Sequence, residues 1–488
     1  MTTPTMFVST ALTAVLAGLF AVSVSADSDH GDRDFGTLVE QILKAQSKKW
    51  FGFGKPLAES APETSGPYRT ATQAAEDQVL LAKRLKVKYL TRNAGDATDM
   101  MAFFPAVNPT HLITCVEGDR ALIATGKFNP SVQRISLATG AVTSILRGMS
   151  ACDGIRTTPW GTVLATEERS DGGAYEILAP LSIADQAVVD RAAGTVTDPD
   201  HIAKRIALPT MAWEGIAVLS SGVVIAGDEL RPGTPADADG GAIFKFIPSA
   251  PYGGSGLITA LAQSPFVAGN VYALQVSCRD STQQYGQGCE VGNAAWIAVN
   301  AATARLNADA SGATGYYRPE DLHADPLFVD PANPAAVRVC WTNTGTESGK
   351  NYAEVLCAVD SDPLAAVPDT RSVLVNRFVE GDPDFNSFDN LDFQPQTGNL
   401  YVIEDHDNGD IFACLRDGGD RDIKTDGCVK MLSVKDSSAE PTGFIFSADG
   451  KTAYLSIQHS DDTDPSIAKV DDYATDDVLM ITGFKIPK

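Results

Sequence analysis

The segment from Cys152 to Glu168 contains the densest set of residues that could carry out chemistry. It begins with Cys152-Asp153-Gly154, continues through Thr158-Pro159-Trp160-Gly161-Thr162, and ends in Glu167-Glu168. We predict a strand over Gly161–Thr166. Because successive side chains of a strand face opposite sides, one of the two glutamates must point inward or into a loop. Carboxylates and a thiolate together could bind iron, and carboxylates could bind calcium; an exposed acidic strand end is the alternative interpretation.

Acidic residues recur at the ends of other predicted strands along the chain. If the inner strands of a closed β-fold converge on one channel, carboxylates that are distant in sequence can share one volume. Calcium takes about six to eight oxygen ligands, so one site needs several such residues. The acidic residues in question are Glu214, Asp228, Glu229, Glu320, Asp389 and Glu440, and the amide oxygen of Asn390 is a further candidate ligand.

The sequence contains no familiar protein nucleophile. Its six histidines are scattered, and there is no His-x-x-x-His pattern, no Gly-x-Ser-x-Gly elbow and no Walker loop. A chain of this kind could use bound cations instead, which polarise a substrate and generate a hydroxide nucleophile. Arg318 could add a bidentate contact to an anionic substrate.

The positioning elements are predicted to be short strands. From about residue 96 onward, apolar or alternating runs are separated by Gly, Asp, Asn and Pro, as at Gly161–Thr166, Asn399–Ile403 and Thr452–Ile457. This succession favours an all-β fold, a β-propeller of about six blades, over a large sandwich. Helical patterns are predicted near Leu38–Leu43, in Ala74–Leu85 and, for a turn or two, in Ile183–Arg191.

Composition and the N-terminus indicate an exported protein. Asp and Glu number 62 against 38 Lys and Arg, a net charge of −24, which disfavours binding to nucleic acid or anionic lipid. Val8–Val24 is apolar, and Val24-Ser25-Ala26 offers a cleavage site, although no twin-Arg motif is present. We therefore expect a signal peptide over 1–26, a partly helical arm over 27–95 and the propeller over 96–488. The mature protein is expected to be secreted or periplasmic, monomeric and free of the membrane.

Eight cysteines fit an oxidising compartment. Six form local couples that we predict to be disulfides: Cys278 with Cys289, Cys340 with Cys357, and Cys414 with Cys428. The remaining two, Cys115 and Cys152, either form a fourth bridge or leave Cys152 as a free thiolate with a chemical task.

The block around Cys152 resembles the PhoX-type alkaline phosphatases, which carry a Cys, Thr-Pro-Trp-Gly-Thr, a short strand and Glu-Glu. Later segments are similar in order, including Trp213-Glu214-Gly215, Gly227-Asp228-Glu229 and Arg318-Pro319-Glu320. The resemblance spans roughly Cys152 to His459. It implies that Cys152 is a metal-bridging thiolate and Glu167 a metal ligand. It also implies that Arg318 grips phosphate, that Glu320 binds metal, and that calcium and Fe³⁺ are the cofactors.

Three hypotheses follow. The first is a phosphomonoesterase acting on small phosphate esters, with Arg318, Glu320 and Cys152 as catalytic residues. The second is a calcium-dependent lactonase or phosphotriesterase propeller, which needs no thiolate. The third is a non-catalytic binding propeller with structural calcium, in which Cys152 is bonded to Cys115. The metal ligands predicted under the first hypothesis are Cys152, Glu167, Glu168, Glu214, Asp228, Glu229, Glu320, Asp389, Asn390 and Glu440.

Overall fold

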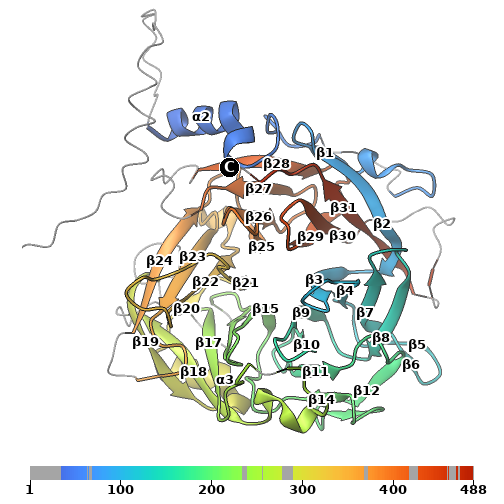
Figure 1. The fold of residues 1–488 in the computed structure, drawn as a ribbon, viewed down its shortest axis with the longest axis vertical. Coiled ribbons are helices and arrows are strands. Elements are labelled where there is room, and N and C mark those ends of the chain that lie inside the picture. Colours follow the sequence, from blue (N-terminus) through green and yellow to red (C-terminus); the bar gives the residue numbers. More distant parts are fainter. Residues whose placement is uncertain are drawn as a thin grey trace, which may run out of the picture.

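A computed structural model shows five mainly antiparallel sheets arranged around a propeller (Figure 1), and the ten-stranded sheet among them supplies two neighbouring blades, which makes six blades. It describes residues 35–486 except 63, 65–68, 234–238, 255, 277–289, 368–371, 417–426, 459, 461–468 and 471–472. Within these residues, the innermost strands of the six blades contact one another in a closed ring, in the order β3, β9, β15, β21, β25, β29 and back to β3. The prediction of an all-β propeller of about six blades is therefore confirmed.

The first three blades follow one another along the chain. The first blade comprises β3 (Thr98–Phe104), β4 (His111–Val116), β7 (Pro130–Ser136) and β8 (Val142–Arg147), with β12 (Gln186–Asp190) and β13 (Thr195–Val196) at its outer edge. The second comprises β9 (Cys152–Thr157), β10 (Thr162–Glu167), β11 (Ala174–Leu178) and β14 (Ile202–Lys204). The third comprises β15 (Trp213–Val218), β16 (Val224–Asp228), β17 (Gly241–Pro248), β18 (Gly269–Val276) and β19 (Gly292–Val299).

The remaining blades complete the ring. The fourth comprises β21 (Pro319–Ala324), β22 (Val337–Asn343), β23 (Glu354–Asp360) and β24 (Val373–Glu380), and β24 also pairs with β19. The fifth comprises β25 (Phe388–Phe393), β26 (Leu400–Glu404), β27 (Asp410–Cys414), β28 (Cys428–Val434) and β1 (Val79–Leu81). The sixth comprises β29 (Glu440–Phe446), β30 (Thr452–Gln458), β31 (Thr475–Thr482) and β2 (Lys86–Gly95). Smaller elements are β5 (Leu122–Ala124), β6 (Lys127–Phe128), β20 (Gly315–Tyr316), α2 (Phe35–Trp50) and α3 (Ala304–Ala310).

The propeller is closed by a strand from the N-terminal part of the chain. β2 pairs antiparallel with β31, so that Lys86 lies opposite Thr482 and Gly95 opposite Thr475. β1 likewise pairs with β28 in the fifth blade. The last part of the arm predicted over residues 27–95 thus supplies two blade strands.

Two of the three predicted helical patterns are wrong and one is confirmed. Ala74–Leu85 contains one turn of 3-10 helix at Ala75–Asp77 and then β1, while β12 occupies Gln186–Asp190 and pairs in parallel with β8. In both places pairing with a neighbouring strand overrides a weak helical period. The amphipathic stretch near Leu38–Leu43 lies in α2, which packs Leu43 into the core of the fifth and sixth blades. No helix of the described residues is long and apolar enough to cross a bilayer, and the predicted signal peptide lies outside those residues.

The core is divided among the interfaces between blades. Six clusters of buried apolar side chains are found, each between two neighbouring blades. Side chains alternate between the two faces of each strand, so every blade contributes to the interface on both of its sides. The disulfides Cys340–Cys357 and Cys414–Cys428 each join adjacent strands within a blade, as predicted. Cys278 and Cys289 lie outside the described residues.

One buried ion pair crosses the interface between the third and fourth blades. The Nζ of Lys245, on β17, donates to Asp360 Oδ2 at 2.8 Å and to the Ala365 carbonyl at 2.7 Å. Trp296 Nε1 also donates to Asp360 Oδ2, at 2.9 Å. Burial lowers the pKa of Lys245, and the Asp360 carboxylate opposes that effect.

We expect Asp360→Asn to lower the free energy of unfolding by about 3–5 kcal/mol, because it leaves the buried Lys245 without its counter-charge. Urea unfolding followed by tryptophan fluorescence measures this. Asp362→Asn, at an exposed position two residues away, should change stability by less than about 0.5 kcal/mol. Equal effects of the two substitutions would contradict a stabilising role for the pair.

Candidate metal centre

Acidic residues enter the centre of the propeller at bulges in the inner strands. In each of five inner strands, two residues lie opposite one residue of the second strand, which shifts the register there. Such bulges re-aim a side chain that regular alternation would place elsewhere. The first residue of each of these five pairs is acidic: Asp99-Met100, Asp153-Gly154, Glu214-Gly215, Glu320-Asp321 and Asp389-Asn390. The sixth inner strand, β29, has the same bulge at Gly443-Phe444, without an acid.

Two consecutive glutamates at the end of the second strand of one blade, Glu167 and Glu168, point in opposite directions. Glu167 is fully buried in its blade, where Arg191 Nε donates to it at 2.7 Å and the backbone N–H groups of Ser150 and Gly173 also donate. The next residue, Glu168, is only partly buried and faces the acids of the inner strands. Alternation of side chains along a strand accounts for the difference. Of the two glutamates predicted as ligands, Glu168 therefore lies with the acids of the centre, and Glu167 is paired inside the fold.

The same alternation separates Asp228 from Glu229. Asp228 is buried and accepts hydrogen bonds from Arg305 Nε at 2.7 Å and from the Ala212 backbone N–H at 3.0 Å. Asp228 therefore does not join the acids at the centre, contrary to its prediction as a ligand. Glu229 follows the strand and instead accepts a hydrogen bond from Arg318.

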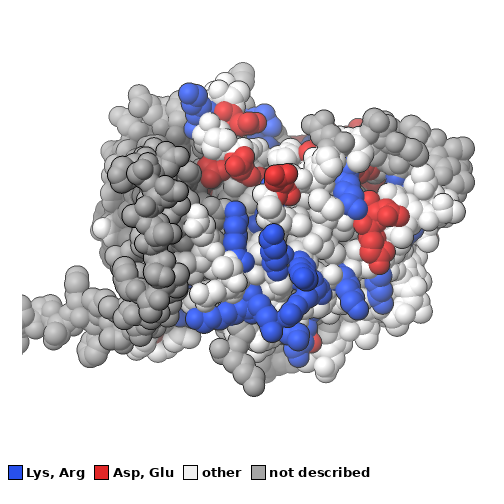
Figure 2. Space-filling model, turned by 90° about the horizontal axis from the view of Figure 1, so that it is seen from above, with Lys and Arg blue, Asp and Glu red and all other residues white. Residues whose placement is uncertain are grey.

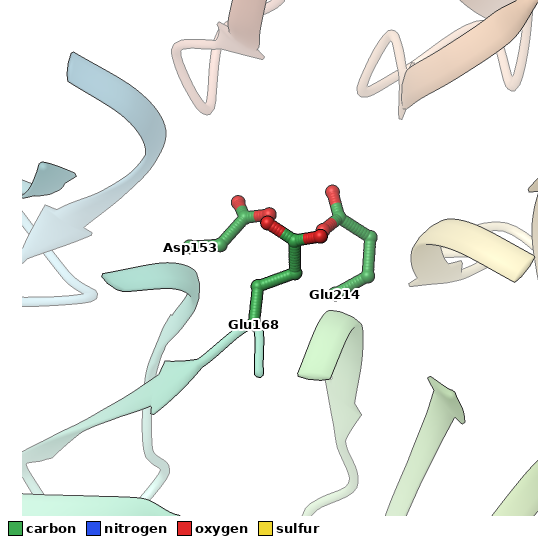
Figure 3. Close-up of side chains that lie close together, drawn as sticks. All are labelled: Asp153, Glu168 and Glu214. Atoms are coloured by element: carbon green, nitrogen blue, oxygen red, sulfur yellow. The ribbon is translucent and has the colours of Figure 1, made fainter. Parts of the chain in front are cut away.

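Five carboxylates form two groups that share Glu214. Oxygen atoms of Asp153, Glu168 and Glu214 lie within 4.8 Å of one another, and those of Glu214, Glu320 and Asp389 do the same. Figure 3 shows the first group, in which the three carboxylates point toward one another from β9, from β15 and from the residue that follows β10. This spacing of hard oxygen donors fits divalent or trivalent cations, and the shared residue allows two cations to be held side by side.

The electrostatics of these residues also fit bound cations. Burial, followed by repulsion from neighbouring carboxylates, raises the pKa of Asp153, Glu168, Glu214 and Asp389 well above the usual range. Asp153 Oδ1 is buried and has no hydrogen-bond partner among the described residues. A buried acceptor without a donor is costly, and a cation would satisfy it and offset the repulsion.

Removal of bound cations should therefore leave a pH signature. An acid whose folded-state pKa is raised binds more protons when folded, so its contribution to stability falls as pH rises above the unfolded value. We expect the chelated protein to lose unfolding free energy from about pH 5 to about pH 8, and calcium to abolish most of that loss. Thermal melts across this range, with and without calcium, measure the effect. A chelated protein that gained stability with pH would contradict it.

Arg318 is the cation that lies among these acids. Its Nη2 lies 3.0 Å from Glu320 Oε1, its Nη1 donates to Asp405 Oδ2 at 2.8 Å, and its Nε donates to Glu229. Burial lowers the pKa of Arg318, but the three carboxylates outweigh that effect and raise it. Its backbone is left-handed, with φ of 54°, which is uncommon for a residue other than glycine and marks a constrained position.

The other predicted residues have different positions. Asn390 Oδ1 accepts from Thr442 Oγ1 at 2.7 Å and from the Gly443 backbone N–H, so it ties two blades together. Glu440 has a pKa raised by burial and then by Asp405 and Asp99, which places it in the same acidic field. The sequence reasoning missed Asp99, Asp153 and Asp405, and also Glu117, whose charge contributes to the raised pKa of Asp99 and of Glu168. For Asp153, the signal was the acid-glycine pair that also occurs at Glu214-Gly215.

Cys152 does not join the carboxylates as a thiolate. It forms a disulfide with Cys115, and both residues are fully buried. The first residue of β9 is thus bonded to a residue near the end of β4. A sulfur in a disulfide carries no thiolate charge with which to bind a metal. The expectation of a metal-bridging Cys152 is corrected, and the fourth bridge is the arrangement found.

These features define the chain as a six-bladed propeller with a carboxylate centre. The profile of the family described as "Alkaline phosphatase PhoX" matches residues 203–461, and the chain belongs to this family. No curated protein matches the sequence.

One solved structure shows the same fold, and a second shows only a weaker similarity. The structure of Pseudomonas fluorescens PhoX in complex with vanadate, a transition state analogue, is 16% identical. The match covers 88% of this chain and 98% of that chain, with a TM-score of 0.59. The PQQ-bound aldose sugar dehydrogenase from Streptomyces coelicolor is 13% identical, with coverage of 83% and 99% and a TM-score of 0.39.

Proposed function

We propose that this protein is an exported, monomeric, metal-dependent phosphomonoesterase that releases phosphate from small organic monoesters. Membership of the PhoX family supports the reaction class. The observation that carries the proposal is the pair of carboxylate groups that share Glu214, with the guanidinium of Arg318 beside Glu320. Substrates of this class are anionic, so they need the positive charge that cations and Arg318 would supply together.

The donor set indicates which cations to expect. Asp153, Glu168, Glu214, Glu320 and Asp389 offer only carboxylate oxygens, which suit calcium and are also accepted by Fe³⁺. When bound, these cations would polarise the phosphoryl oxygens of the substrate as Lewis acids. With Cys152 in a disulfide, iron would be held without thiolate.

The chain's own residues bind and orient the substrate. Arg318 presents several N–H donors on a planar group, which matches two non-bridging phosphate oxygens. Glu229 and Asp405 hold two sides of that guanidinium and so fix its direction. Asp99, Glu214 and Glu320 are nearly inaccessible, whereas Glu168 and Asp389 are partly exposed. Substrate would therefore approach from the side of the partly exposed acids.

A second candidate is a calcium-dependent lactonase or phosphotriesterase. The Cys115–Cys152 disulfide is compatible with it, because such an enzyme needs calcium and carboxylates but no thiolate; the same disulfide is the arrangement expected of a non-catalytic binding propeller. The absence of any turnover, with calcium bound, would instead favour a binding propeller.

Metal analysis and a substrate panel test the proposal. The purified protein should contain calcium, with or without iron, and should hydrolyse p-nitrophenyl phosphate in a calcium-dependent manner. Glu320→Gln should remove this activity. Glu354 is a buried glutamate on β23 that pairs with Arg377 on β24. The Glu354→Gln variant should retain the activity in its folded fraction. Turnover of a lactone or a phosphotriester without turnover of the monoester would overturn the proposal.

A further inference from the structure

A basic surface lies on the outer side wall of the propeller, away from its centre. Figure 2 views this wall from the top of Figure 1, and Lys and Arg side chains gather across it. Segments 41–58 and 78–95 contain nine Lys and Arg residues and no Asp or Glu, which leaves 29 of the 38 basic residues to balance all 62 acidic ones. The two segments correspond to the end of α2 with its following loop, and to β1 with β2.

The wall contains a cavity lined by cations. Its volume is about 550 Å³, within the range of about 300–1,000 Å³ typical of small-molecule sites. The charged side chains that line it are all basic: Lys44, Lys48, Lys55, Lys83 and Arg84. In the part of the chain that the structure describes, no carboxylate is paired with Lys48, Lys55, Lys83 or Arg84. Five like charges therefore surround one space.

The backbone holds these residues in place. The Gly54 N–H donates to the Lys83 carbonyl at 2.7 Å, and the Lys83 N–H donates to the Lys55 carbonyl at 2.9 Å. A Cβ at Gly54 would lie 2.5 Å from the Lys83 carbonyl oxygen, so this approach requires glycine. Arg84 has a left-handed backbone, with φ of 84°. Backbone strain of this kind persists only where the surrounding structure enforces it, often at a ligand site.

Local roles explain only part of this charge. Lys48 and Lys49 occupy the last turn of α2, where cations are favourable for the helix dipole. That role does not extend to Lys55, Lys83 and Arg84, which lie on a loop and a turn. Lys86 and Lys88, on β2, line a second cavity of about 780 Å³, which Glu76 also lines.

We propose that this cavity binds a soluble oligophosphate, a compact anion with several phosphate groups. Arg and Lys are the residues that bind phosphate, and several of them in one concave space favour a multiply charged ligand. No aromatic side chain lines the cavity, so it offers no stacking surface for nucleic-acid bases. None of the exposed large apolar side chains lies between Gln41 and Lys88, so nothing there would insert into a bilayer. The proposal is independent of the chemistry at the carboxylate centre.

The test is titration calorimetry of the full purified protein with sodium tripolyphosphate. We expect binding that weakens as salt is added. The triple substitution Lys48→Gln/Lys55→Gln/Lys83→Gln should reduce affinity by about tenfold or more. The matched control Arg231→Gln/Lys350→Gln/Lys451→Gln removes the same charge from exposed positions elsewhere and should bind like the wild type. Hydrolysis of p-nitrophenyl phosphate and the melting temperature should be similar in both variants, which shows that both are folded.

Two results would overturn the proposal. One is that the wild-type protein does not bind tripolyphosphate, or that the triple variant binds it with the same affinity as the wild type. The other is a protein that does not bind tripolyphosphate but sediments with anionic phospholipid vesicles and not with neutral ones. That sedimentation would have to be lost in the triple variant. That second result would assign the surface to a membrane.

Discussion

Glu214→Gln is expected to lower phosphate release by about three orders of magnitude and, at the same time, to stabilise the metal-free protein. Glu214 belongs to both carboxylate groups, so its loss disrupts every cation that the two groups hold. Without cations, the same carboxylate is repelled by Asp153, Glu320 and Asp389, and burial adds to the cost. Neutralising it should therefore raise the unfolding free energy of the chelated protein by about 1 kcal/mol or more.

The measurement combines steady-state hydrolysis with thermal melts in chelator and in calcium. Glu176→Gln is the matched control, because Glu176 is also a fully buried glutamate but is paired with Arg205 and accepts from Trp160 Nε1 at 2.8 Å. The control should lose stability under both conditions. A Glu214→Gln protein that is destabilised equally in chelator and in calcium would show that Glu214 is a structural residue.

Arg318→Ala is expected to reduce kcat/KM for p-nitrophenyl phosphate by about a hundredfold to a thousandfold. Its guanidinium is the cation that faces Glu229, Glu320 and Asp405, so it is positioned to contact phosphate beside the metal ligands. Arg318→Lys should recover only a small part of the loss, because an ammonium group cannot make the planar bidentate contact.

Arg377→Ala provides the control, since Arg377 also pairs with a buried glutamate, Glu354, but lies in a different part of the fourth blade. It should alter stability rather than kcat/KM. Full activity of Arg318→Lys would show that a single positive charge is sufficient and would contradict the bidentate role. Inhibition by vanadate, tested in parallel, should weaken in Arg318→Ala if this residue contacts the phosphoryl group.

The sequence predicted the architecture better than the individual ligands. Short apolar runs between turns indicated the blades, because each strand leaves its own period in the sequence. Whether Glu167 or Glu168 faces the centre depends on how the alternation of side chains continues past the end of β10. A register shift between Ala165 and Glu167 lies directly before that point. Register shifts leave no period of their own, so adjacent acids could not be assigned.

Contacts between blades were the other feature that the sequence could not supply. The pairing of Cys115 with Cys152 requires β4 and β9 to be neighbours, although they belong to different blades. Asp99 approaches Thr442, from the opposite end of the chain, and Thr442 Oγ1 donates to it. Such proximity follows from closure of the ring and from no local pattern.

Ring closure also imposes an order of events on biosynthesis. Because β2 pairs with β31, the sixth blade cannot be completed until the chain has been synthesised through Thr482. Until β31 has been synthesised, β2 lacks the strand with which it pairs in the finished fold. An unpaired strand of this kind is a site for aggregation during synthesis. The acids of the first and fifth blades, Asp99 and Asp389, reach each other only after this step. The complete carboxylate centre thus assembles late, and metal loading belongs to the compartment in which the finished chain folds.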